Sequence, residues 1–220
     1  MRKVYAIVAM TLLVGMLSGC PQPKLTELRV LHASPDAPAI DICLDGNKFV
    51  ENLDYGEISV YKITAHGTRI LRLVAAGDAC YSTDAIERSI NLARSADYSI
   101  VALDYVDDLD LVTFNDNNTA PEPGMSKVRF VHAIPNGPTV DVRTDDDELL
   151  FEDIAFKEGS GYIQVTPGTY NLQLNESITG LVPIVHINNV TFNSDRVITI
   201  FAIGILGGDP GIQLIITTDD

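Results

Sequence analysis

The chain contains no tryptophan and half as many basic as acidic residues, and each shortage narrows what it can bind. Without an indole ring, a carbohydrate platform has to use smaller aromatic faces, and the candidates are Tyr55, Tyr61, Tyr81, Tyr105 and Tyr162. The formal net charge is −15. Because such a surface repels polyanions, we expect no nucleic-acid partner. Cationic ligands, divalent metal ions and basic protein surfaces remain open as partners.

Familiar catalytic and cofactor-binding motifs are also missing. The sequence has no G-x-S-x-G nucleophile elbow, phosphate loop, dinucleotide fingerprint or array of zinc ligands. A catalytic triad can still form from residues far apart in the chain, so a hydrolase would need His32, His66 or His186 beside a serine and a carboxylate. Ser34 is close to His32 in sequence, but Ile134 takes its place in the repeat described below. We predict a protein that is not an enzyme, with a hydrolase as the least favoured alternative.

Cysteine is scarce, and the first of the three cysteines closes an export signal. Arg2 and Lys3 precede an uncharged apolar run from Val4 to Leu17. This pattern is typical of a signal peptide and is short for a permanent membrane-spanning helix. The residues at its end, Leu17-Ser18-Gly19-Cys20, resemble the lipobox of bacterial lipoproteins. That resemblance implies a diacylglycerol thioether on Cys20, cleavage before it and acylation of the new N-terminus.

A lipid on Cys20 would place the protein in the cell envelope, with the membrane itself as a partner. Each buried acyl methylene is worth about 0.8 kcal/mol, so two or three chains anchor firmly where one anchors weakly. Because Pro21 follows the cysteine, no aspartate there argues for retention in an inner membrane. We therefore favour the outer membrane in a cell with two membranes. An ordinary secretory signal with a chance cysteine, or an uncleaved anchor, is the alternative.

The other two cysteines, Cys43 and Cys80, form a candidate disulfide. Outside the cytoplasm an even pair of cysteines is oxidised as a rule. The second repeat has neither cysteine, and Arg143 stands in the place of Cys43. Two free thiols are the alternative, whereas a metal site lacks neighbouring histidines at ligand spacing.

The chain repeats itself with an offset of 100 positions. Residues 28–42 align without a gap onto residues 128–142, and an arginine, a histidine, an alanine, two prolines and an aspartate recur. With a slip of one residue the match continues to Tyr61 with Tyr162 and to the Gly-Thr pair of each copy. The chain therefore contains a duplicated module.

Within each copy the apolar residues alternate with period two, which predicts strands with one buried face. Glycine, proline and Asx clusters separate these runs, as expected for a sandwich of seven or eight antiparallel strands per module. The fold class we predict is all-β, with two tandem immunoglobulin-like antiparallel β-sandwiches. The predicted division is a signal peptide over 1–19, a lipidated cysteine and tether over 20–27, a first sandwich over 28–115, a linker over 116–126 and a second sandwich over 127–220.

The repeated motif identifies a family resemblance. The stretch His32-Ala33-Ser34-Pro35-Asp36-Ala37-Pro38-Ala39-Ile40-Asp41 resembles the opening signature of the bacterial family catalogued as domain of unknown function 4397. Both modules share the resemblance, although the second departs from it at Ile134, Asn136 and Gly137. It implies an immunoglobulin-like sandwich in an exported or anchored protein, and it brings no established activity or catalytic residue.

Physically, the motif predicts a turn. Two prolines three residues apart remove two amide donors, so the first strand ends before the chain re-enters a sheet. We expect the Asp or Asn between the prolines to bond nearby backbone amides and close the turn. The histidine of the motif is expected to be a packed or hydrogen-bonded residue. The residues assigned to this structural role are His32, Pro35, Asp36, Pro38, Asp41, His132, Pro135, Asn136, Pro138 and Asp141.

Two acidic clusters are weak calcium candidates. They are Asp107, Asp108 and Asp110, and Asp145, Asp146 and Asp147 with Glu148. Calcium takes six to eight oxygen ligands, but neither cluster has the spacing of an EF-hand loop. We favour solvated turns that discourage edge pairing as the explanation for both clusters. We expect no cofactor, with calcium as the open alternative.

Together these observations predict a non-catalytic, lipid-anchored envelope protein whose tandem sandwiches serve as an interaction, adhesion or spacer unit. The expected partner is an unidentified envelope protein or glycan. A lipoprotein that binds a small ligand, either calcium or a glycan, is the alternative.

Overall fold

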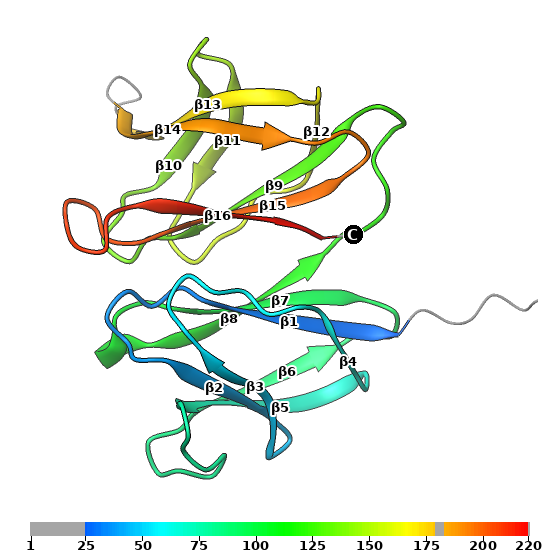
Figure 1. The fold of residues 1–220 in the computed structure, drawn as a ribbon, viewed down its shortest axis with the longest axis vertical. Coiled ribbons are helices and arrows are strands. Elements are labelled where there is room, and N and C mark those ends of the chain that lie inside the picture. Colours follow the sequence, from blue (N-terminus) through cyan, green and yellow to red (C-terminus); the bar gives the residue numbers. More distant parts are fainter. Residues whose placement is uncertain (1–24, 179–182, 220) are drawn as a thin grey trace, which may run out of the picture.

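The computed structural model describes residues 25–178 and 183–219, which form two β-sandwiches stacked one above the other (Figure 1). The predicted signal peptide and Cys20 lie outside the described residues. The elements are strands apart from one turn of 3-10 helix, η1 (Val106–Asp108). The prediction of an all-β fold with two sandwich modules is therefore confirmed. No helix in the described part of the chain is long and apolar enough to span a bilayer.

Each sandwich consists of two four-stranded sheets. In the first sandwich the inner sheet has the order β4-β1-β7-β8 and the outer sheet has the order β3-β2-β5-β6. The bounds of its strands are β1 (Thr26–His32), β2 (Ile40–Leu44), β3 (Asn47–Leu53), β4 (Lys62–Thr64), β5 (Gly67–Ala75), β6 (Ile86–Leu92), β7 (Asp97–Leu103) and β8 (Asp110–Asp116).

The second sandwich repeats this topology strand for strand. Its inner sheet has the order β12-β9-β15-β16 and its outer sheet has the order β11-β10-β13-β14. The bounds of its strands are β9 (Ser126–Ala133), β10 (Val140–Thr144), β11 (Leu149–Ile154), β12 (Ile163–Val165), β13 (Gly168–Glu176), β14 (Pro183–Phe192), β15 (Val197–Ile203) and β16 (Gln213–Thr218).

The centre of each inner sheet departs from the antiparallel pattern that the sequence predicted. Strand β1 pairs in parallel with β7, and β9 pairs in parallel with β15. No hairpin connects either pair, because after β1 and after β9 the chain first crosses to the outer sheet. Alternation along one strand specifies which face is buried but not the direction of a distant partner.

The turns lie where glycine, proline and Asx residues predicted them. Asp45 and Gly46 connect β2 to β3 with positive φ angles of 50° and 82°. A left-handed backbone suits glycine, and aspartate tolerates it better than most residues. The acidic run from Asp145 to Glu148 forms the equivalent turn between β10 and β11. Thr83 and Asp84 form a turn that leads into β6.

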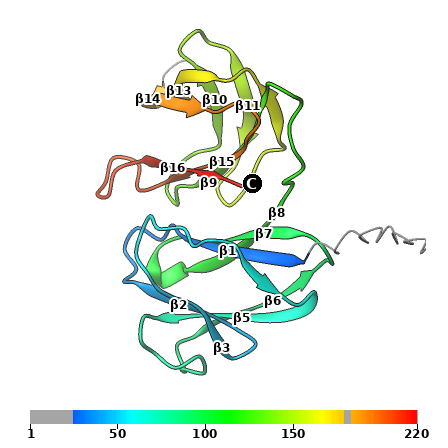
Figure 2. The same ribbon diagram turned by 45° about the vertical axis from the view of Figure 1, so that its right-hand side comes forward.

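Each sandwich has its own apolar core between its two sheets. In β1, Leu28 and Val30 point into the first core, and Val128 and Phe130 do so in β9. The intervening side chains of the same strands point to the opposite face, toward the other sandwich. The two inner sheets therefore face each other, and the molecule consists of four sheet layers (Figures 1 and 2).

Candidate functional site

The two sandwiches pack together through an apolar core of their own, which we call the seam core. Its eight buried side chains are Leu31, Ala33, Val101, Leu103, Val131, Ala133, Phe201 and Ile203. Because the central strands are covered on both faces, β7 and β15 are buried along their whole length and have nearly continuous apolar sequences. A seam of this kind resembles the interior of a domain more than a mobile contact between domains.

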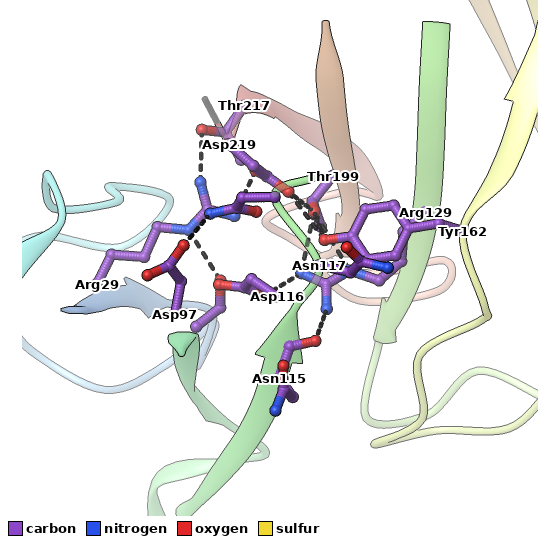
Figure 3. Close-up of polar contacts among 12 residues, drawn as sticks. Arg29, Asp97, Asn115, Asp116, Asn117, Arg129, Tyr162, Thr199, Thr217 and Asp219 are labelled. Carbon is purple, nitrogen blue, oxygen red and sulfur yellow. Dashed lines mark hydrogen bonds and ion pairs between the residues drawn. The ribbon is translucent and has the colours of Figure 1, made fainter. Parts of the chain in front are cut away.

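Beside the seam core, two buried ion pairs cross from one sandwich to the other (Figure 3). Arg29 of the first sandwich lies 2.5 Å from Asp219 of the second. Arg129 of the second lies 2.5 Å from Asp116 of the first. The four side chains are at most 3% exposed. The contact is reciprocal, as at an isologous interface between two copies of one surface.

Two hydroxyl groups connect these ion pairs into a closed ring. Ser99 accepts a hydrogen bond from Arg29 Nε at 2.8 Å and donates one to Asp116 Oδ2 at 2.8 Å. Thr199 does the same in the second sandwich. It accepts from Arg129 at 3.0 Å and donates to Asp219 at 2.5 Å. Hydrogen bonds therefore satisfy the buried charges, which burial would otherwise make costly. The seam ring consists of Arg29, Ser99, Asp116, Arg129, Thr199 and Asp219.

A tyrosine covers each arginine of the seam ring. The guanidinium of Arg29 lies 4.6 Å from the ring centroid of Tyr61, whose hydroxyl donates to Asp116 at 2.7 Å. Tyr162 covers the other arginine at 4.8 Å and donates to Asp219 at 3.1 Å. Burial raises the pKa of both tyrosine hydroxyls, so they remain donors. Burial also raises the pKa of Asp219, against the opposing effect of its arginine partner.

The connection between the sandwiches is held against the seam. Asp116, which the sequence assigned to the linker, is the buried last residue of β8, and Ser126 already belongs to β9. Lys127 donates to the carbonyl oxygens of Asn117 and Thr119 at 2.8 and 3.0 Å. Burial lowers the pKa of this lysine.

The repeated histidines hold the turn that follows the first strand of each module. His32 Nε2 lies 3.0 Å from the carbonyl oxygen of Pro38, and its Nδ1 accepts from the amide of Ser34 at 3.3 Å. His132 makes the same contacts with Pro138 and with the amide two residues further on. Because a carbonyl needs a donor, the ring is neutral with its proton on Nε2. Burial lowers the pKa of both histidines, which favours this neutral form.

The polar residue between the motif prolines reaches further than the sequence predicted. Asp36 Oδ1 accepts from the amide of Val106, 70 residues along the chain, at 2.8 Å. Asn136 makes two bonds with the backbone of Leu206 at 2.8 and 3.0 Å. The expectation of a bond to a nearby amide was therefore wrong. In each sandwich this side chain connects the loop of the motif prolines to the loop that follows β7 or β15.

The repeated aspartates hold irregular backbone of the outer sheets. Asp41 accepts from the amides of Asn52 and Gly77 at 2.6 and 2.9 Å and pairs with Lys48. Burial would raise the pKa of Asp41, but Lys48 and the two amides hold it below its usual value. Asp141 accepts from the amide of Asp153 at 3.0 Å. Since Asn52 and Asp153 have positive φ angles of 49° and 55°, the carboxylates stabilise equivalent bends.

Cys43 and Cys80 form a disulfide in the structure. It connects β2 to the loop between β5 and β6. Tyr81, beside it, is 71% exposed, and the guanidinium of Arg72 lies 4.6 Å from its ring centroid.

The structure disperses the acidic calcium candidates. Asp110 pairs with Arg88 and lies 3.5 Å from Lys157. Asp147 pairs with Arg143. The other members are exposed, and the described residues include no group of three or more His, Cys, Asp or Glu side chains arranged to hold a metal ion. The candidates at exposed positions are Asp107, Asp108, Asp145, Asp146 and Asp147.

The histidines proposed for a triad are also apart. His32 is occupied by backbone groups, and His66 is exposed. His186 lies 3.9 Å from Asp145 on the surface of the second sandwich. Ser34 Oγ is buried and has no hydrogen-bond partner among the described residues, which agrees with the isoleucine that replaces it in the second copy.

The tyrosines proposed as a glycan platform are divided as well. Tyr61 and Tyr162 belong to the seam, and Tyr55 packs at the edge of the seam core with its ring 6.2 Å from that of His32. The seam ring itself was not predicted from the sequence. The recurrence of an arginine at 29 and 129, inside strands that are apolar on both sides, was the available signal.

Comparison with known families gives one result. A family model described as a domain of unknown function, DUF4397, matches residues 26–143 and 126–220. Among curated proteins, none matches the chain.

Proposed function

Since the chain belongs to the DUF4397 family of domains of unknown function, we propose that it is a non-catalytic envelope protein with two sandwiches acting as one rigid interaction or spacer unit. A lipid on Cys20 would hold this unit on a membrane. The mature chain, without Arg2 and Lys3, carries a net charge of −17, which favours a basic protein surface as the partner.

The seam carries this proposal. Flexibly linked modules would move independently on a tether. A partner that bound both modules would then have to offset the conformational entropy that they lose on binding. Here eight buried apolar residues and two buried ion pairs oppose such motion. A unit of fixed shape is suited to hold a binding face at a set distance from its anchor.

Distance measurement between the modules tests the rigidity. Spin labels at Glu51→Cys and Glu152→Cys would lie on equivalent exposed positions of β3 and β11. We expect one narrow distance distribution by pulsed electron spin resonance. Adding Phe201→Ala should broaden it, because the seam core loses its largest side chain. A broad distribution in the protein with an intact seam would contradict the proposal.

Labelling in cells tests the anchor and the partner. A radioactive fatty acid should be incorporated into the wild-type chain and not into Cys20→Ala, which should also leave the membrane fraction. Photo-crosslinking groups on the turn at Asp45 should capture an envelope protein. Turnover in a broad hydrolase screen, together with no captured partner, would refute a non-catalytic interaction role.

A further inference from the structure

A cavity of about 300 Å³ opens between the two sheets of the first sandwich. It lies at the end of the sandwich that contains η1, opposite the end at which β1 begins (Figure 1). Its floor consists of Ile40, Leu73 and Leu109, which are buried members of the first core. A volume of this size is at the lower limit for small-molecule sites, which range over about 300–1,000 Å³ and are mostly apolar.

One wall of the cavity is the loop between β5 and β6, and that loop is fixed at three points. The disulfide joins Cys80 to Cys43 of β2. The amide of Gly77 donates to Asp41 at 2.9 Å, and Lys48 donates to the carbonyl oxygen of Asp78. A wall that is already ordered loses little conformational entropy when a ligand binds.

A hydrogen bond also holds the facing wall of the cavity. It includes Val106 of η1, whose amide donates to Asp36 at 2.8 Å. The family motif at the end of β1 therefore positions one side of the cavity, and the disulfide loop positions the other. The second module lacks both cysteines, so this construction is specific to the first.

The charged side chains that line the cavity are all acidic. Asp78 and Asp84 line its mouth together with the hydroxyl of Ser82, and no basic residue is among the described residues that line it. Asp107 and Asp108 follow Val106 in the same 3-10 turn, η1, and are exposed. An anion would be repelled here, whereas a cation with an apolar body matches both the carboxylates and the floor.

We propose that this cavity binds a small organic ammonium ion. Its alkyl or aryl body lies on Ile40, Leu73 and Leu109, and its cationic head faces Asp78 and Asp84. The proposal needs neither the lipid anchor nor the rigid seam, because every residue that forms the site belongs to the first sandwich.

Calorimetric titration of the full chain tests this proposal. The protein is held in lipid nanodiscs, so that no free detergent can occupy the cavity. The probes are butylammonium, phenethylammonium and cyclohexylammonium, with phenylacetate and phenethyl alcohol as the anionic and neutral controls for shape. We expect saturable binding of at least one ammonium ion, no binding of phenylacetate, and weaker binding at high salt. Absence of binding by all three ammonium ions, or equal binding of an ammonium ion and its neutral control, would overturn it.

Variants separate the two parts of the site. Asp78→Asn with Asp84→Asn should weaken ammonium binding about tenfold, which corresponds to about 1.4 kcal/mol. Ser82→Phe should obstruct the mouth and abolish binding. The matched control, Asp145→Asn with Asp146→Asn, makes the same charge change on the second sandwich and should leave binding unchanged. If the control pair weakens binding as much as the cavity pair, the attraction is due to overall charge and the site is refuted. Circular dichroism checks that each variant folds.

Discussion

Replacing Arg129 by methionine should destabilise the protein strongly, although methionine fills much of the same space. The change removes the partner of Asp116, whose side chain is 0% exposed, and leaves a carboxylate buried between the sandwiches. Breaking a buried pair by removing one partner costs about 3–5 kcal/mol. Hydrogen bonds from the same arginine to Thr199 and to the carbonyl oxygen of Asn115 are lost as well.

Equilibrium unfolding in urea, followed by circular dichroism, measures this loss against a matched control. Arg88→Met breaks a surface pair with Asp110, in which the side chains are 47% and 27% exposed, and exposed pairs contribute about 0–1 kcal/mol. Adding Asp116→Asn to Arg129→Met should recover part of the lost stability, because the buried charge is then gone while Ser99 and Tyr61 keep an acceptor. If the two arginine variants lose equal stability, or if the added asparagine recovers nothing, buried charge is not what makes the seam ring sensitive.

Three further outcomes follow from groups that the structure buries. Ser34→Ala should leave the free energy of unfolding unchanged or raise it by up to about 2 kcal/mol in urea unfolding, because it removes a buried hydroxyl without a partner; a loss of stability would contradict this. The folded-state pKa values of His32 and His132 lie below the ordinary 6.5, so the unfolded chain takes up protons first as the pH falls. Stability measured across pH should therefore be full above about pH 6.5 and decline below it by at most about 1.4 kcal/mol per pH unit for each histidine, with a shallower decline in His32→Gln. Cys43→Ala with Cys80→Ala, which opens a loop with a sequence separation of 37, should lower the free energy of unfolding by about 4 kcal/mol by the chain-entropy estimate, and an unchanged urea midpoint would show that the unfolded chain gains no freedom.

Features encoded locally could be predicted from the sequence. Alternation in runs such as Leu172-Gln173-Leu174 indicates which face of a strand is buried, and Asp45 and Gly46 suit the left-handed backbone of their turn. The two sandwiches and most of their turns followed from such signals, without any knowledge of distant contacts.

Features that depend on distant partners could not be predicted. An arginine in a strand, such as Arg29, looks like an outward-facing surface residue until a second sheet covers that face. Asp116 lies beside asparagines in a polar segment, and only the approach of Arg129 distinguishes it from a linker residue. The cavity could not be predicted either, because its floor and mouth combine residues from four separate stretches of the chain.

The reciprocity of the seam explains why the duplicated residues recur. A surface that binds its own copy about a two-fold axis needs one set of complementary groups, since each group is used once from either side. Arg29 with Asp219, and Arg129 with Asp116, are these two uses of one arginine–aspartate contact. Duplication of a single module supplies both halves at once, and the segment between Asp116 and Ser126 has only to let the second copy turn over the first. The recurrence of the seam residues at equivalent places in the two modules and the packing of the sandwiches are thus consequences of the same self-complementary face.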